Sequence, residues 1–81
     1  MSVDITVFTR TNCPYCELMK KFLTLKSVTY KTVNIENDAA AYEQVMKLTG
    51  RAIAPTTLFT RQDGTQEVVT GYNLGRIASL L

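Results

Sequence analysis

The N-terminal part of the chain alternates between strand and helix patterns, and this alternation most constrains the fold. Val3–Thr9 alternates apolar with polar residues and is rich in β-branched side chains, as a half-buried strand is. A helix pattern runs from Pro14 to about Lys26, and Tyr30–Ile35 is a second strand pattern. Two successive strands joined by a helical crossover must run parallel. The apolar residues at helical spacing are Leu18, Met19, Phe22, Leu23 and Leu25.

A second helix pattern follows the second strand. Asn37 or Asp38 caps its start, because short polar side chains accept hydrogen bonds from free N–H groups there. Gly50 ends it, because Gly readily takes the left-handed conformation that follows a last helical turn. The apolar residues expected on one side of this helix are Tyr42, Val45, Met46 and Leu48.

The C-terminal part predicts a hairpin and a short helix. Thr56–Thr60 and Gln66–Thr70 are strand patterns joined by an Asp63-Gly64 turn, and Asn73 caps a last helix. We therefore expect one α/β domain over residues 1–81, in the order β-α-β-α-β-β-α, with a mixed four-stranded sheet flanked by three helices. The expected core residues are Phe8, Phe22, Leu23, Val33, Val45, Leu58, Phe59, Val68 and Ile77.

Composition excludes several classes of protein. Nine Lys and Arg against seven Asp and Glu give a net charge of +2, with no long run of like charges. We therefore expect no nucleic-acid partner and no lipid-binding patch. The apolar runs are too short to span a membrane, and the start lacks the basic and apolar segments of a signal peptide. The chain has no His, which excludes imidazole general bases and zinc sites that contain His. We expect the protein to be a monomer.

A disulfide between the two cysteines, Cys13 and Cys16, would contribute little to the stability of the fold. A secreted domain of this size usually needs more bridges than one four-residue loop. A loop this short also stabilises a fold little through chain entropy. We therefore place the protein in the reducing cytoplasm and expect the two thiols to be chemically active.

The chemistry lies where the first strand leads into the first helix. Pro14 suits the first helical position, which places Cys13 at the N-cap. There the free backbone N–H groups and the helix dipole favour a thiolate, so we expect the pKa of Cys13 to be lowered. Arg10, three residues earlier, adds to this effect. Cys16 lies one turn into the helix, within reach of Cys13 for a disulfide.

Metal binding is the commonest alternative for a Cys-x-x-Cys pair. Two thiolates supply half of a tetrahedral site, and the chain has neither a His nor a second Cys pair to complete it. We therefore expect no metal site and no tightly bound cofactor. The setting of strand, Cys-Pro-Tyr-Cys and helix favours redox chemistry instead.

Thr9–Cys16 resembles the active-site segment of glutaredoxins, in which Cys-Pro-Tyr-Cys is the common dithiol form and a basic residue stands three before the first Cys. Gly50–Pro55 is similar to the stretch before the family's cis-proline. The resemblance, to small bacterial or phage-type members, covers essentially the whole chain. It implies a thioredoxin-like fold and a dithiol–disulfide oxidoreductase with glutathione as co-substrate. Cys13 would be the nucleophile and Cys16 the resolving thiol. It also implies that Pro55 is cis and that the backbone of Ala54 faces Cys13, where it pairs with an extended substrate.

One region departs from the glutaredoxin pattern. Glutaredoxins commonly have Gly-Gly and then acidic residues that help hold the amino end of glutathione, whereas this chain has Thr70-Gly71-Tyr72-Asn73-Leu74. Gly71-Tyr72 is similar to the Gly-Phe of redoxins that serve class Ib ribonucleotide reductase and are reduced by thioredoxin reductase. Those redoxins usually have another dipeptide between the cysteines. The resemblance implies disulfide-bearing proteins as targets, ribonucleotide reductase among them, and leaves glutathione and thioredoxin reductase open as reductants.

A rival function from another class is an iron–sulfur cluster carrier. Two chains would share one cluster, with Cys13 and a bound glutathione from each side supplying four sulfurs. Pro14 argues against this by stiffening the turn. A thioredoxin-like adaptor without catalysis is disfavoured by the presence of both thiols.

The resemblance also indicates a glutathione-binding groove around the thiols. Arg10 and Arg51 match the geometry of glutathione's carboxylates, although Arg is common on protein surfaces. Tyr15 either lines the groove or shields the first turn of the helix, and Tyr72 either closes one wall of the groove or serves in packing. The remaining candidate groove residues are Ala54, Pro55, Gly71 and Asn73.

Overall fold

The computed structural model describes residues 3–81. Met1 and Ser2, at the start where we expect no signal peptide, lie outside the described residues. The described elements are β1 (Val3–Thr9), α1 (Pro14–Leu25), β2 (Lys31–Asn34), α2 (Ala39–Thr49), β3 (Thr56–Arg61), β4 (Gln66–Thr70) and α3 (Leu74–Leu80). This order confirms the predicted β-α-β-α-β-β-α sequence. Within residues 3–81, no helix combines the length and apolar character needed to cross a membrane.

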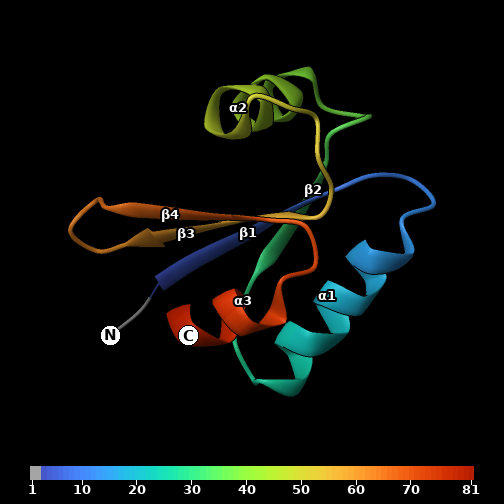
Figure 1. Cartoon of the computed structure of the whole chain (residues 1–81). Coiled ribbons are helices and arrows are strands. Elements are labelled where there is room, and N and C mark those ends of the chain that lie inside the picture. Colours follow the sequence, from blue (N-terminus) through green and yellow to red (C-terminus); the bar gives the residue numbers. More distant parts are fainter. Residues whose placement is uncertain (1–2) are drawn as a thin grey trace.

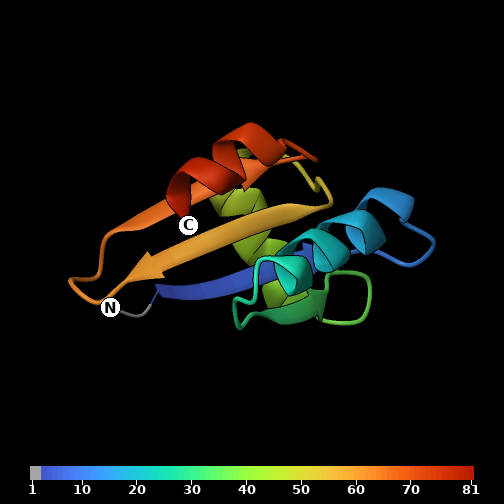
Figure 2. The same ribbon diagram turned by 90° about the horizontal axis from the view of Figure 1, so that it is seen from below.

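The strands form one sheet in the order β2-β1-β3-β4. β1 runs parallel to β2 and antiparallel to β3, and β3 and β4 form an antiparallel hairpin. α2 covers one face of the sheet, while α1 and α3 cover the other (Figure 1). Figure 2, seen from the side of α1 and α3, shows α2 behind the sheet. The predicted mixed sheet flanked by three helices is confirmed.

Each face of the sheet carries its own hydrophobic cluster. The residues buried on the side of α1 and α3 are Ile5, Val7, Met19, Leu23, Phe59, Val69 and Ile77. Those buried on the side of α2 are Phe8, Ile35, Ala41, Val45 and Leu58. Successive residues of a strand point to opposite faces, so β1 supplies Val7 to one cluster and Phe8 to the other. Of the predicted core residues, Phe22, Val33 and Val68 are only partly buried.

The apolar sides predicted for the first two helices include residues that the structure exposes to solvent. Leu25 is 82% exposed, and Leu18, Tyr42 and Met46 are also exposed. The buried stripe of α1 is limited to Cys16, Met19 and Leu23, and that of α2 to Ala41 and Val45. One residue of an α-helix turns the side chain by about 100°, so Leu25 points nearly away from Leu23. Tyr42 and Met46 each follow a buried residue by one position and are turned toward solvent.

The helix ends use the predicted capping residues. Asp38 accepts a hydrogen bond from the N–H of Ala41 at the start of α2. Gly50 ends α2 with a φ of 80°, in the left-handed region that favours Gly. Asn73 caps α3 by accepting from the N–H of Arg76. These local interactions fix where the helices begin and end, and thereby the loops that surround the cysteines.

Thr57 provides a test of the packing within β3. Its hydroxyl is buried and has no hydrogen-bond partner among the described residues, which is unfavourable in an apolar interior. Val has nearly the same shape without the hydroxyl, so Thr57→Val should raise the free energy of unfolding by about 1 kcal/mol. Denaturant unfolding of both proteins measures this difference.

The matched control is Thr56→Val. The Thr56 hydroxyl donates to the Ile53 carbonyl at 2.7 Å, so its removal should lower the free energy of unfolding by about 1 kcal/mol. A loss of stability in Thr57→Val as large as in Thr56→Val would show that the Thr57 hydroxyl is satisfied.

Candidate active site

The two cysteines sit at the start of α1, as predicted. Cys13 is the N-cap residue, with extended backbone, and Pro14 is the first helical residue. Cys13 and Cys16 form a disulfide with their Cα atoms 5.2 Å apart. The Sγ of Cys13 also accepts a hydrogen bond from the Cys16 N–H at 3.2 Å. The sulfur thus occupies the position that a capping oxygen usually takes, where a negative charge is favoured.

The two cysteines differ in their access to solvent. Cys16 is 1% exposed and belongs to the stripe of α1 that faces the sheet. Cys13 is only half-buried, because it precedes the helix. An external disulfide can therefore reach Cys13 first, while Cys16 attacks from within the protein. This asymmetry fits the roles of nucleophile and resolving thiol.

The Ala54–Pro55 peptide bond is cis, as the resemblance implied. Pro55 precedes Thr56, which pairs with Phe8 near the end of β1, the strand that leads to Cys13. The Pro55 carbonyl accepts a hydrogen bond from the Gly71 N–H at 2.7 Å. Gly71 has a φ of 71°, a conformation that suits Gly. The segment after β4 is thereby tied to the cis-proline.

Tyr15 and Tyr72 form an aromatic contact at the site. Their ring centroids lie 5.6 Å apart, with the ring planes tilted by 38°, a favourable geometry for an aromatic pair. Tyr15 is 59% exposed, whereas Tyr72 is partly buried and packs against the core cluster beneath α1 and α3. Tyr72 therefore anchors an exposed aromatic surface that begins between the two cysteines. The sequence indicated each Tyr separately and gave no signal of their contact.

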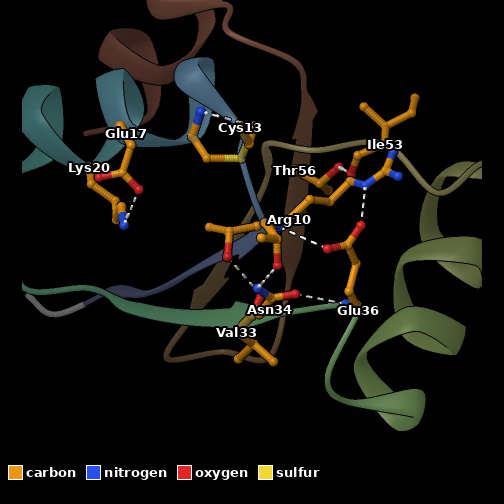
Figure 3. The surroundings of a disulfide bond; sticks show 12 residues. Arg10, Cys13, Glu17, Lys20, Val33, Asn34, Glu36, Ile53 and Thr56 are labelled. Carbon is orange, nitrogen blue, oxygen red and sulfur yellow. Dashed lines mark hydrogen bonds and ion pairs between the residues drawn. A yellow bond between two sulfur atoms is a disulfide. The ribbon is translucent and has the colours of Figure 1, made fainter.

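Arg10 is engaged by a residue that the sequence reasoning missed. Its Nε lies 3.4 Å from Oε2 of Glu36, which follows β2. Figure 3 shows the Arg10 guanidinium extending toward Glu36 and Ile53 and away from the sulfur of Cys13. The expectation that Arg10 acts directly on Cys13 therefore finds no support in this geometry. The contact could have been inferred from the sequence, because Arg10 and Glu36 each follow one of two parallel neighbouring strands, whose ends meet at one edge of the sheet.

Hydrogen bonds hold the Glu36 carboxylate in place. Oε1 accepts from the backbone N–H of Thr11 at 3.0 Å, and the Glu36 N–H donates to the Asn34 side chain at 2.8 Å. The Asn34 amide in turn donates to the Thr11 hydroxyl at 3.3 Å. Hydrogen bonds from Thr11, together with Arg10, lower the pKa of Glu36. Glu36 is therefore ionised at neutral pH and links β2 to the loop that carries Cys13.

An open pocket adjoins this ion pair. It has a volume of about 490 Å³ and is lined by Arg10, Ile35, Glu36, Tyr42 and Ala52. This volume lies within the range of small-molecule sites. The pocket explains part of the exposure of Tyr42, whose side chain lines it instead of entering the core.

The other predicted groove residues differ in their exposure and contacts. Arg51 is exposed just after α2, and its N–H donates to the Thr49 hydroxyl at 3.1 Å. The side-chain oxygen of Asn73 is used in the cap of α3. Ala54, which precedes Pro55 in the chain, and Gly71, which donates to the Pro55 carbonyl, are half-buried. A role in binding glutathione is still a prediction for all four candidates. Among residues 3–81, no group of three or more His, Cys, Asp or Glu side chains is placed to hold a metal ion.

The sheet order, the flanking helices and the cysteine pair at the start of α1 define a thioredoxin-like protein. The chain is similar to the solved structure of the thioredoxin-like protein BC3987, with 32% identity and a TM-score of 0.81 over 95% of this chain and 99% of that one. The glutaredoxin of Archaeoglobus fulgidus shares the fold, with a TM-score of 0.78 and 20% identity over 94% of this chain and 83% of its own.

Sequence comparison identifies the family. The Glutaredoxin family model matches residues 5–62. Glutaredoxin 3 of Escherichia coli strain K12 is 30% identical over 59 residues, which are 73% of this chain and 71% of that protein. The chain belongs to the glutaredoxin family. The disulfide between Cys13 and Cys16 agrees with the dithiol–disulfide oxidoreductase activity that this membership indicates.

The helix-cap position of Cys13 predicts different titrations for the two reduced thiols. Cys13, isolated in the Cys16→Ser variant, should react with iodoacetamide with a midpoint well below the pKa of about 8.5 of a free thiol. Cys16, isolated in Cys13→Ser, should react far more slowly because it is buried. Alkylation rates followed against pH measure both. A midpoint near 8.5 for Cys13 would remove the helix-cap argument.

Proposed function

We propose that this protein is a glutathione-dependent dithiol–disulfide oxidoreductase of the reducing cytoplasm. It reduces protein disulfides and mixed disulfides with glutathione. The observation that carries the proposal is the pairing of an accessible Cys13 at a helix N-cap with a buried Cys16 one turn later. The cis-proline in the segment beside them supports substrate binding through the backbone of Ala54.

The reaction proceeds by two thiol–disulfide exchanges. The Cys13 thiolate attacks one sulfur of the substrate disulfide, and the other sulfur leaves as a thiolate. Cys16 then attacks Cys13 in the mixed disulfide, and its proton passes to a departing thiolate. The substrate disulfide gains two electrons and becomes two thiols, one protonated by Cys16 and the other by water, and the Cys13–Cys16 disulfide forms. A low pKa of Cys13 helps most in the return reaction, where Cys13 is the leaving group of a mixed disulfide, because a thiolate of low pKa leaves faster.

Two glutathione molecules then return the enzyme to the dithiol form, and glutathione disulfide is released. The first forms a mixed disulfide with Cys13 and frees Cys16, and the second attacks this mixed disulfide. In this proposal, the backbone of Ala54 pairs with the glutathione backbone, and Arg10 and Arg51 attract its carboxylates. The open pocket beside Arg10 supports this placement. Pro55, Gly71 and Asn73 shape the opposite wall with the Tyr15–Tyr72 pair.

Reduction by thioredoxin reductase is the second candidate. It is favoured by Arg10, whose charge is already paired with Glu36, and by the exposed ring of Tyr15 on Tyr72, which offers a protein-docking surface. With either reductant, ribonucleotide reductase is a target by resemblance. The discriminating assay supplies NADPH and an oxidised disulfide substrate, with either glutathione and glutathione reductase or thioredoxin reductase alone. Turnover with thioredoxin reductase and none with glutathione and glutathione reductase would reject the glutathione proposal.

The two cysteines should separate two activities. Cys16→Ser should retain the reduction of glutathione mixed disulfides, because that reaction needs one enzyme thiol, and should lose reduction of protein disulfides that need resolution by Cys16. Cys13→Ser should lose both by at least 100-fold, because it removes the nucleophile. Turnover of each substrate by the two variants measures this split. Activity left intact in Cys13→Ser would contradict the mechanism.

A further inference from the structure

We propose that Glu36 determines how strongly this site accepts glutathione. The Glu36 carboxylate forms an ion pair with Arg10, which in the proposed function binds a carboxylate of glutathione. Glu36 and glutathione therefore compete for the Arg10 guanidinium. The inference rests on the proposed function only in the choice of ligand. It assigns a specificity-determining role to a residue outside the Cys-Pro-Tyr-Cys segment.

The Arg10–Glu36 pair is open to displacement. The Arg10 side chain is 50% exposed and that of Glu36 39%, and both line the pocket. An ion pair this exposed is weak. The contact uses Nε of Arg10, whereas a guanidinium carries five donors and binds a carboxylate best through two of them. A carboxylate from solvent can therefore bind Arg10 with better geometry than Glu36 does.

Glu36 stays in place when Arg10 turns away from it to bind another carboxylate. The Thr11 N–H holds one carboxylate oxygen, and the Glu36 backbone is tied to Asn34. When a glutathione carboxylate takes Arg10, the negative charge of Glu36 thus stays beside it. The two carboxylates, that of Glu36 and that of glutathione, repel each other when they lie side by side. This repulsion weakens the binding of an anionic substrate and leaves a neutral disulfide unaffected. Glu36 therefore selects against carboxylate-bearing substrates at the pocket.

The test compares two disulfides in the Cys16→Ser background, where Cys13 reacts once. Glutathione disulfide carries carboxylates, and bis(2-hydroxyethyl) disulfide is neutral. Glu36→Gln keeps an oxygen for the Thr11 N–H and removes the charge. We expect it to raise the ratio of the two rate constants, glutathione disulfide over neutral disulfide, by about fivefold, the upper range for an exposed ion pair. Stopped alkylation and mass analysis of Cys13 measure both rate constants.

Two control variants make the result specific. Glu67→Gln removes the same charge from an ion pair of β4 and α3, where Glu67 contacts Arg76 at 2.6 Å, and should leave the ratio unchanged. Arg10→Gln should lower the ratio, and adding Glu36→Gln to it should then have no further effect. A ratio that Glu36→Gln leaves unchanged would overturn the inference. So would an equal rise in the Arg10→Gln background, which would indicate a general effect of charge.

The failure of this inference is distinguishable from failure of the proposed function. The single reaction of Cys13 with glutathione disulfide requires no reductase and no turnover. If wild-type protein fails to turn over with glutathione while Glu36→Gln raises the ratio, the inference holds and the proposed reductant is wrong. If wild-type protein turns over with glutathione and the ratio is unchanged, Glu36 has no part in specificity.

Discussion

The backbone pairing of β1 with two neighbours is the constraint on which the rest of the structure depends. β1 runs parallel to β2 and antiparallel to β3, so the end of β1, the end of β2 and the start of β3 meet at one edge of the sheet. The segments that follow or precede these ends carry Cys13, Glu36 and Pro55. A reactive thiol, a charged network and a cis-proline are thereby gathered from three distant parts of the chain.

This edge combines a rigid part with an adaptable part. Cys13 and Cys16 lie at the start of α1, whose inner stripe is buried against the sheet. The Pro55 carbonyl accepts a hydrogen bond from Gly71. The reacting groups are therefore held by packed elements. Around them lie exposed side chains whose contacts solvent can replace, the Arg10–Glu36 pair and the ring of Tyr15. Fixed chemistry beside an open surface suits an enzyme that performs one exchange reaction on differing disulfides.

Sequence patterns predicted the elements well and the exposure of individual side chains less well. Capping residues and strand alternation depend on neighbours in the chain, so the ends of α2 at Asp38 and Gly50 and the bounds of β1 were predictable. An apolar residue such as Leu25 satisfies the same pattern whether or not another layer covers it. The width of the covered stripe depends on how α1 lies on the sheet, which no local pattern encodes.

The sequence by itself determined the chemistry of Cys13 and Cys16. Their separation by Pro14 and Tyr15 before a helix places one sulfur at the N-cap and the other one turn inside, and both positions follow from helix geometry. Only the tertiary structure decided what surrounds them. Arg10 meets Glu36, and Tyr15 meets Tyr72, because strand pairing and helix packing bring these residues together across the chain. Such contacts have no periodicity in the sequence, since they arise from the order of strands in the sheet.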